Sequence, residues 1–128
     1  MISFDEMENI AHQLISPIQL NKYIKYGHVA AVIQCESGHI YTGINIDTAC
    51  SMGFCAEHGA IADMIKHREN RIMKVITVNK YRDIIPPCGR CREFISQINR
   101  ENIHAEVKVN KELVLSLGEL LPFDWKNV

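Results

Sequence analysis

Three cysteines and one glutamate constrain this chain more than any other feature. Cys55 and Glu57 stand two residues apart, and Cys88 and Cys91 follow later as a Cys-x-x-Cys pair. Thiolates are good zinc ligands, and a catalytic zinc usually keeps three protein ligands with its fourth position open to water. The pattern therefore predicts one Zn²⁺ ion per chain, held by Cys55, Cys88 and Cys91.

Each part of this motif is placed where a helix should begin. Pro87 stands directly before Cys88, and proline favours the first turn of a helix. The positive end of the helix dipole also favours thiolate over thiol. Glu57 is close enough to Cys55 to reach a water on the metal without being a ligand, so we expect it to act as a general acid/base.

Three other interpretations of the motif are open from the residues alone. The cysteines can form a structural zinc site, which would need a fourth ligand, and Cys50 and His58 are the candidates. Cys88 and Cys91 can form a redox pair, although the expected strand before a Cys-x-x-Cys near the amino end is missing. Glu57 can be a solvated carboxylate in a first turn, but three neighbouring thiolates would repel it, so proton transfer explains it better.

Length and composition predict a single domain spanning residues 1–128. Basic residues number 14 and acidic residues 15, for a net charge of −1, which argues against a nucleic-acid polymer and favours a small uncharged substrate. No apolar run approaches the ~20 residues of a membrane span, and the acidic amphipathic amino end is unlike a signal peptide. An odd number of cysteines, five, fits a reducing compartment. We expect a cytoplasmic protein that does not bind membranes.

Hydrophobic periodicity predicts alternating helices and strands. Helices are expected at residues 2–15, with Ser3 as the cap, and then at 56–65, 88–98 and 116–121. A hairpin is expected from strands 29–35 and 39–46, followed by strands at 72–78 and 103–109. The segments 18–27, 47–54 and 79–87 are expected to be connections. This order implies an α/β fold in which helices cover both faces of a mixed sheet.

The chain contains four motifs in sequence: TGINIDTAC (42–50), CAEHGAI (55–61), PPCGRCRE (86–93) and ELLPF (119–123). In this order they resemble the motifs of the cytidine deaminase family of zinc-dependent nucleoside deaminases, including its blasticidin S deaminase-like members. The resemblance runs from Val29 onward. It implies a three-layer α-β-α fold with a mixed sheet of five-stranded type. It also implies that cytidine or deoxycytidine is deaminated to uridine or deoxyuridine plus ammonia, in pyrimidine salvage.

The resemblance assigns substrate contacts to several positions. Asn45 and Asp47 match the residues that hold the ribose hydroxyls, and Ala56 lies in the matching substrate-binding segment. Asp47 is one methylene shorter than the family's glutamate, and the loop from Asn45 to Cys55 is one residue shorter, so both changes move the sugar pocket. Residues of these types also favour ordinary strand-end turns.

Aromatic residues are the next set of candidates. Tyr26 is near a position where the family often has an aromatic residue, and Phe54 is a second stacking candidate, although such residues are usually part of the core. Phe123 matches a phenylalanine that reaches a neighbouring subunit's active site, and its alternative is a core residue at the carboxyl end. The resemblance thus implies a homotetramer with active sites at subunit interfaces.

A last group concerns the charge around the metal. His58 stands where the family's tetrameric members usually carry arginine, so a neutral imidazole would donate a hydrogen bond to a thiolate without cancelling its charge. It can equally be a histidine on the helix surface. Arg90 or Arg92 can supply the cation, and Arg92 can also serve an interface. The altered pocket leaves two alternative functions, deamination of blasticidin S or another 4-aminopyrimidine derivative, and a non-catalytic zinc-binding module.

Overall fold

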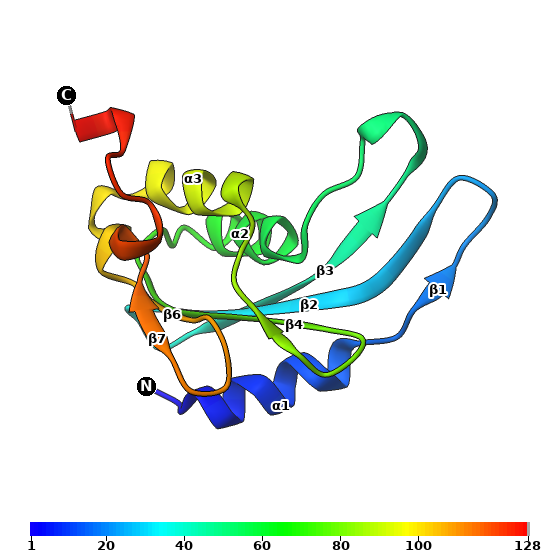
Figure 1. The fold of residues 1–128 in the computed structure, drawn as a ribbon, viewed down its shortest axis with the longest axis horizontal. Helices are drawn as coiled ribbons and strands as arrows, with labels where there is room; N and C mark the ends of the chain where they lie inside the picture. The colour runs from blue at the N-terminus through cyan, green and yellow to red at the C-terminus, as the bar shows by residue number, and fades with distance from the viewer. Residues whose placement is uncertain (128) are drawn as a thin grey trace.

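A mixed β-sheet separates two layers of helices in the computed structural model, which describes residues 1–127 (Figure 1). Its main strands are β2 (Lys25–Cys35), β3 (Ile40–Asp47), β4 (Ile72–Asn79), β6 (Glu106–Lys108) and β7 (Val114–Ser116). β2 pairs antiparallel with β3 on one edge and with β4 on the other. β4 runs parallel to β6, and β6 runs antiparallel to β7. The order across the sheet is therefore β3-β2-β4-β6-β7.

Two strands of two residues each extend this sheet to seven strands. β1 (Ile18–Gln19) pairs with β2 on the edge opposite β3, because Lys25 faces both Gln19 and Asp47. β5 (Ile84–Ile85) pairs with the end of β4. Both lie in segments that the sequence predicted to be connections, since a two-residue strand carries no readable alternation.

Helices cover both faces, which confirms the three-layer arrangement. α1 (Phe4–Leu14) lies on one face, and α2 (Ala56–Lys66) and α3 (Gly89–Ile98) lie on the other (Figure 1). The predicted cap of α1 is confirmed: the Ser3 hydroxyl accepts from the Glu6 backbone N–H at 3.1 Å. Among residues 1–127, no helix combines the length and the apolar character needed to cross a membrane.

The alternation of side chains along β4 divides the core into two halves. Ile76 and Val78 pack in the α1 half, and Val75 packs in the half beneath α2 and α3. Because neighbouring side chains on a strand point to opposite faces, Thr77 lies on the same face as Val75. A buried threonine therefore faces the layer that carries the cysteine motif.

The predicted strand at 103–109 is wrong over its first half. A 3-10 helix, Arg100–His104, precedes the three-residue strand β6. The reason is tertiary: the buried Asn102 side chain accepts from the Ile72 N–H at 2.8 Å and donates to the carbonyls of Asn70 and Ile95 at 3.0 and 3.1 Å. This network holds a turn that no local pattern signals.

The predicted helix at 116–121 is also wrong. Ser116 ends strand β7, and a 3-10 turn, Gly118–Leu120, stands in place of the predicted helix. The backbone N–H of Leu117 donates to the Ala105 carbonyl at 2.9 Å, which keeps the chain paired with the β6 side of the sheet. Pairing with the sheet therefore outweighs the helical spacing of the leucines.

Candidate active site

The two helix starts on one face of the sheet bring the three predicted cysteines together. Cys55 is the residue directly before α2, Cys88 is the residue directly before α3, and Cys91 lies in the first turn of α3. The Sγ atoms of Cys55 and Cys88 are 3.4 Å apart, and those of Cys88 and Cys91 are 3.5 Å apart. Those of Cys55 and Cys91 lie within 4.8 Å. All three sulfurs can therefore reach one ion.

The spacing and chemistry of these donors fit zinc. Sulfurs bound tetrahedrally to one zinc at ~2.3 Å stand roughly 3.8 Å from one another, close to the distances observed here. Within the described chain all five cysteines are free thiols, so no disulfide competes for these three. Cys55, Cys88 and Cys91 would hold the metal with only small movements of their side chains.

The cysteines differ in how readily they lose a proton. Burial raises the pKa of Cys55 and of Cys91, and the Glu57 charge raises the pKa of Cys91 further. Burial also acts to raise the pKa of Cys88, but hydrogen bonds from the Cys91 backbone N–H and from Cys55 outweigh it, so the net shift is downward. Cys88, at the start of a helix, is thus the thiol most ready to become a thiolate.

His58 is a fourth donor at the edge of this cluster. Its Nδ1 lies 3.6 Å from Cys91 Sγ, and the ligand atoms of Cys55, His58 and Cys91 all lie within 4.8 Å of one another. Its ring packs against Phe94 with the centroids 4.8 Å apart. Burial, and then the charge of Arg90, lower the pKa of His58, which favours the neutral imidazole. The other candidate for a fourth ligand, Cys50, is exposed and outside this cluster among residues 1–127.

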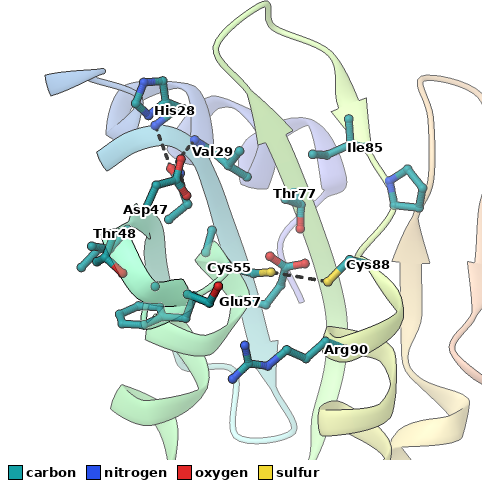
Figure 2. A pocket seen from close by; sticks show the side chains of 17 residues that line it. His28, Val29, Asp47, Thr48, Cys55, Glu57, Thr77, Ile85, Cys88 and Arg90 are labelled. Atoms are coloured by element: carbon teal, nitrogen blue, oxygen red, sulfur yellow. Dashed lines mark hydrogen bonds between the residues drawn. The ribbon is translucent and has the colours of Figure 1, made fainter. Parts of the chain in front are cut away.

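Glu57 is the acidic group of the site. It is only 2% exposed, and burial raises its pKa, against smaller lowering effects from its own backbone N–H and nearby side chains. Figure 2 shows its carboxyl beside the line that joins Cys55 and Cys88. A buried carboxyl with a raised pKa, next to a metal-binding cluster, is well suited to receive and return a proton near neutral pH.

A cleft of about 680 Å³ opens over this group. Its walls come from β2, β3, β4, β5, the loop after β3 and the starts of α2 and α3, and they include Asn45, Asp47, Ala56, Glu57 and Arg90. Cys55 and Cys88 line it, whereas His58 lines a separate, shallower depression. The volume lies within the ~300–1,000 Å³ typical of small-molecule sites. Cys55, Cys88 and Glu57 therefore face the cleft, and His58 lies at another side of the cysteine cluster.

Asn45 shapes one wall of the cleft. Its Oδ1 accepts from the backbone N–H groups of His28 and Val29 at 2.8 and 2.9 Å, at an irregularity in the pairing of β2 with β3. Its Nδ2 donates to Asp47 Oδ1 at 3.2 Å. One N–H of Asn45 and the second oxygen of Asp47 remain to contact a ligand.

Three residues that the sequence predicted for the site do not line the cleft, unlike Asn45 and Asp47. Tyr26 lies on β2 and is not among the described residues that line the cleft. Phe123 projects fully into solvent with a left-handed φ of 55°. Arg92 donates to the Pro87 carbonyl at 2.8 Å and to the Leu120 carbonyl at 3.2 Å, so it ties the start of α3 to the carboxyl-terminal segment. Phe54, in contrast, does line the cleft.

Residues 6–109 match the family model described as the cytidine and deoxycytidylate deaminase zinc-binding region. The chain belongs to this deaminase family. The match confirms the resemblance seen in the four motifs and, together with the donor cluster, the expectation of a zinc cofactor.

Individual relatives agree with this assignment. A cytidine deaminase of Proteus mirabilis is 32% identical over 102 residues, which cover 77% of this chain but 32% of the relative, so the chain spans about a third of its length. A blasticidin-S deaminase of Bacillus cereus is 27% identical over 108 residues, covering 77% and 76% of the two chains. The crystal structure of cytidine deaminase from Mycobacterium tuberculosis superposes with a TM-score of 0.80 at 19% identity, covering 98% of each chain. That superposition confirms the deaminase fold.

The structure adds residues to the candidate site that the sequence patterns did not single out. Gly43 on β3 and Gly59 on α2 meet where the helix packs on the sheet. Thr77 and His28 line the cleft. In the sequence, the two glycines are ordinary members of longer motifs, and Thr77 is one residue of a continuous apolar strand. No local pattern therefore indicated that these residues contribute to the site.

Proposed function

We propose that this chain catalyses the hydrolytic deamination of a free pyrimidine nucleoside, converting cytidine or deoxycytidine to uridine or deoxyuridine with release of ammonia. One observation carries the proposal: a buried carboxyl, Glu57, lies beside three metal-binding thiols in a cleft large enough for a nucleoside. Membership of the deaminase family supports the same chemistry. Pyrimidine salvage in the cytoplasm is the proposed setting, which suits a chain of free thiols.

We assign the zinc to Cys55, Cys88 and Cys91, with one ion per chain. When bound, zinc would lower the pKa of a coordinated water towards ~7. His58 would then donate a hydrogen bond to the Cys91 thiolate from the side away from the cleft, in keeping with their 3.6 Å separation. This arrangement leaves the cleft side of the ion open, as a catalytic site needs.

Glu57 would move the protons of the reaction. Its carboxylate takes a proton from the attacking water and passes it to the ring nitrogen of the pyrimidine. Glu57 then carries the proton of the hydroxyl newly formed on the ring carbon to the exocyclic amine. The carbon–nitrogen bond breaks as the carbonyl forms and ammonia leaves, so that one water is consumed for each ammonia released. Burial in the floor of the cleft keeps this exchange away from bulk solvent.

Asn45 and Asp47 would bind the sugar hydroxyls at the other end of the cleft. Each retains hydrogen-bonding capacity, and their mutual bond at 3.2 Å holds both side chains in place. Ala56 also lines the cleft, and its small side chain would leave room for the pyrimidine ring. Asp47→Ala should therefore raise the KM for cytidine while free cytosine stays a poor substrate.

A second substrate class has a specific observation in its favour. The relatives of this chain include the blasticidin-S deaminase of Bacillus cereus, which is 27% identical and is covered over 76% of its length. Arg90 adds an exposed cation to the cleft. Blasticidin S or another 4-aminopyrimidine derivative is thus the alternative substrate.

Ammonia release from purified, zinc-containing protein tests these assignments. The panel is cytidine, deoxycytidine, blasticidin S, cytosine and adenosine, and Glu57→Gln is the inactive control. Turnover of cytidine or deoxycytidine supports the proposal, and selective turnover of blasticidin S supports the alternative. If every compound is inert while the zinc is stoichiometric, the chain is a non-catalytic zinc module, and the proposal fails.

We also propose a homotetramer in which Phe123 of one subunit completes the cleft of another. The segment that carries Phe123 is held to α3, because Lys126 Nζ contacts Glu93 at 2.8 Å and Trp125 Nε1 donates to Glu93 at 3.2 Å. The full exposure of the Phe123 ring leaves it available for contact with a second subunit. Light scattering should give a tetramer, and Phe123→Ala should weaken assembly or substrate binding. A fully active monomer would contradict the assignment.

A further inference from the structure

Two buried polar atoms lack a hydrogen-bond partner within residues 1–127, and both belong to residues that line the cleft. They are Thr77 Oγ1 and His28 Nδ1. Buried side-chain polar atoms are nearly always paired, with protein or with water, because an orphan destabilises the fold. Finding both exceptions in one cleft indicates that its ligand supplies the missing partners.

Thr77 is positioned by the sheet to meet a ligand near the reacting end. It is only 2% exposed, and its neighbours on adjacent strands are Ala31 and Ile85. Figure 2 shows its side chain on the Glu57 side of the cleft. The hydroxyl lies close to the Glu57 carboxyl, yet it makes no hydrogen bond of ordinary distance and angle with any described group. Its hydrogen bond is therefore still available.

His28 is positioned by the irregularity in β2. The pairing of β2 with β3 shifts register between Tyr26 and Ala30, and Asn45 holds the His28 backbone N–H in this segment. Such irregularities re-aim a side chain relative to a regular strand. Figure 2 shows His28 near Asp47, away from Glu57 and Cys88. Its Nδ1 can donate or accept, depending on the tautomer.

We propose that Thr77 and His28 are two further substrate-contacting residues, Thr77 bonding a polar atom of the pyrimidine ring and His28 bonding the substituent carried at the sugar position. This inference rests on the proposed function and deepens it. A ligand that satisfies both atoms must span the cleft, so the site selects a pyrimidine with a polar substituent over the free base.

Binding measurements on Thr77 variants test the ring contact. Calorimetric titration of cytidine is made in the zinc-loaded Glu57→Gln background, where turnover should be slower by about a hundredfold or more. Thr77→Val removes the hydroxyl at nearly constant shape and should weaken cytidine binding about fivefold, as expected for one lost hydrogen bond. Thr77→Ser restores a hydroxyl and should recover most of that loss. The melting temperature of Thr77→Val should not fall, because the substitution removes an orphaned group.

The same titration tests the proposed contact between His28 and the substituent at the sugar position. His28→Leu should weaken cytidine binding about fivefold while leaving the weaker binding of cytosine unchanged, since the free base does not reach His28. His28→Asn, whose amide can occupy the place of Nδ1, should recover part of the loss. Equal losses for cytidine and cytosine would show that His28 acts on the fold and not on the substituent.

The outcomes separate this inference from the proposed function. If wild type releases no ammonia from any nucleoside, the proposed function fails, while binding of cytidine to the Glu57→Gln background still decides the contacts. If that background does not bind cytidine, or if Thr77→Val and His28→Leu bind it as tightly as their parent, the inference is overturned. A melting temperature of Thr77→Val well below that of its parent would assign the hydroxyl a structural role instead.

Discussion

The contact between α2 and β3 gives the sharpest test of how the fold positions the site. A Cβ added at Gly43 would lie 2.2 Å from the Ala56 carbonyl oxygen and 2.5 Å from the Ala60 nitrogen. Both are backbone atoms of α2, so no side chain can turn aside. The helix packs directly on the Gly43 backbone, and its first turn carries Glu57.

Gly43→Ala should therefore displace the helix and destabilise the protein. Since ordinary contacts begin near 3.4 Å, α2 must retreat by roughly 1 Å. Overpacking of this kind costs about 1–3 kcal/mol, which corresponds to a fall in melting temperature of roughly 3–15 °C for a domain of this size. Cys55 and Glu57 move with the helix start, and a misplacement of ~1 Å can cost about a hundredfold in turnover.

Gly59→Ala is the matched control, because it adds a methyl group from the other side of the same contact. That Cβ would lie 3.5 Å from the Gly43 Cα, an ordinary van der Waals distance. Alanine also favours the helix over glycine by up to ~1 kcal/mol, so the melting temperature should hold or rise. Calorimetric melting, zinc content and ammonia release would be measured for both variants. A Gly43→Ala protein that melts at or above wild type would refute the reasoning.

Three further predictions concern the metal, the acid/base group and acid stability. Cys88→Ala, purified without added metal, should lose its zinc whereas Cys50→Ala should keep it, and full zinc in Cys88→Ala by metal analysis would remove that thiol from the ligand set. Glu57→Gln should keep zinc and fold but lose about a hundredfold or more in kcat, and a rate near wild type would require another base. Hydrogen bonds from the Ser37 hydroxyl and two neighbouring side chains lower the pKa of Glu69 to about 2. The stability that the Glu69 carboxylate gives the folded protein is therefore fully present above ~4.3, the pKa of glutamate in the unfolded chain. It is lost as the pH falls towards 2. Glu69→Gln should flatten the loss of melting temperature with acid over that range, and an unchanged slope would contradict this role.

The parts of the fold that the sequence predicted are those fixed by local chemistry. Cysteines before a helix start, a capping serine and alternating apolar residues each act over a few residues, so α1, α2 and α3 were found close to their observed bounds. The cysteine cluster follows from the same helix starts. Local signals were enough to place the metal ligands near each other.

The parts that were missed depend on contacts between distant segments. Asn102 replaces a predicted strand by a turn because its partners are Ile72, Asn70 and Ile95. Thr77 reads as one more residue of a buried strand, and only the assembled layers show that it faces the cleft. The outward placement of Phe123 likewise depends on how Glu93 holds the segment that follows it.

The charge balance of the site brings these observations together. Three thiolates and one Zn²⁺ sum to −1, and the three candidates for an offsetting group are now distinguishable. His58 contacts Cys91, but its lowered pKa leaves it neutral. The Arg92 guanidinium donates to the carbonyls of Pro87 and Leu120 and is not among the described residues that line the cleft. Arg90 lines the cleft, and its charge is near enough to lower the pKa of His58. We therefore infer that Arg90 offsets the thiolate charge from the cleft side.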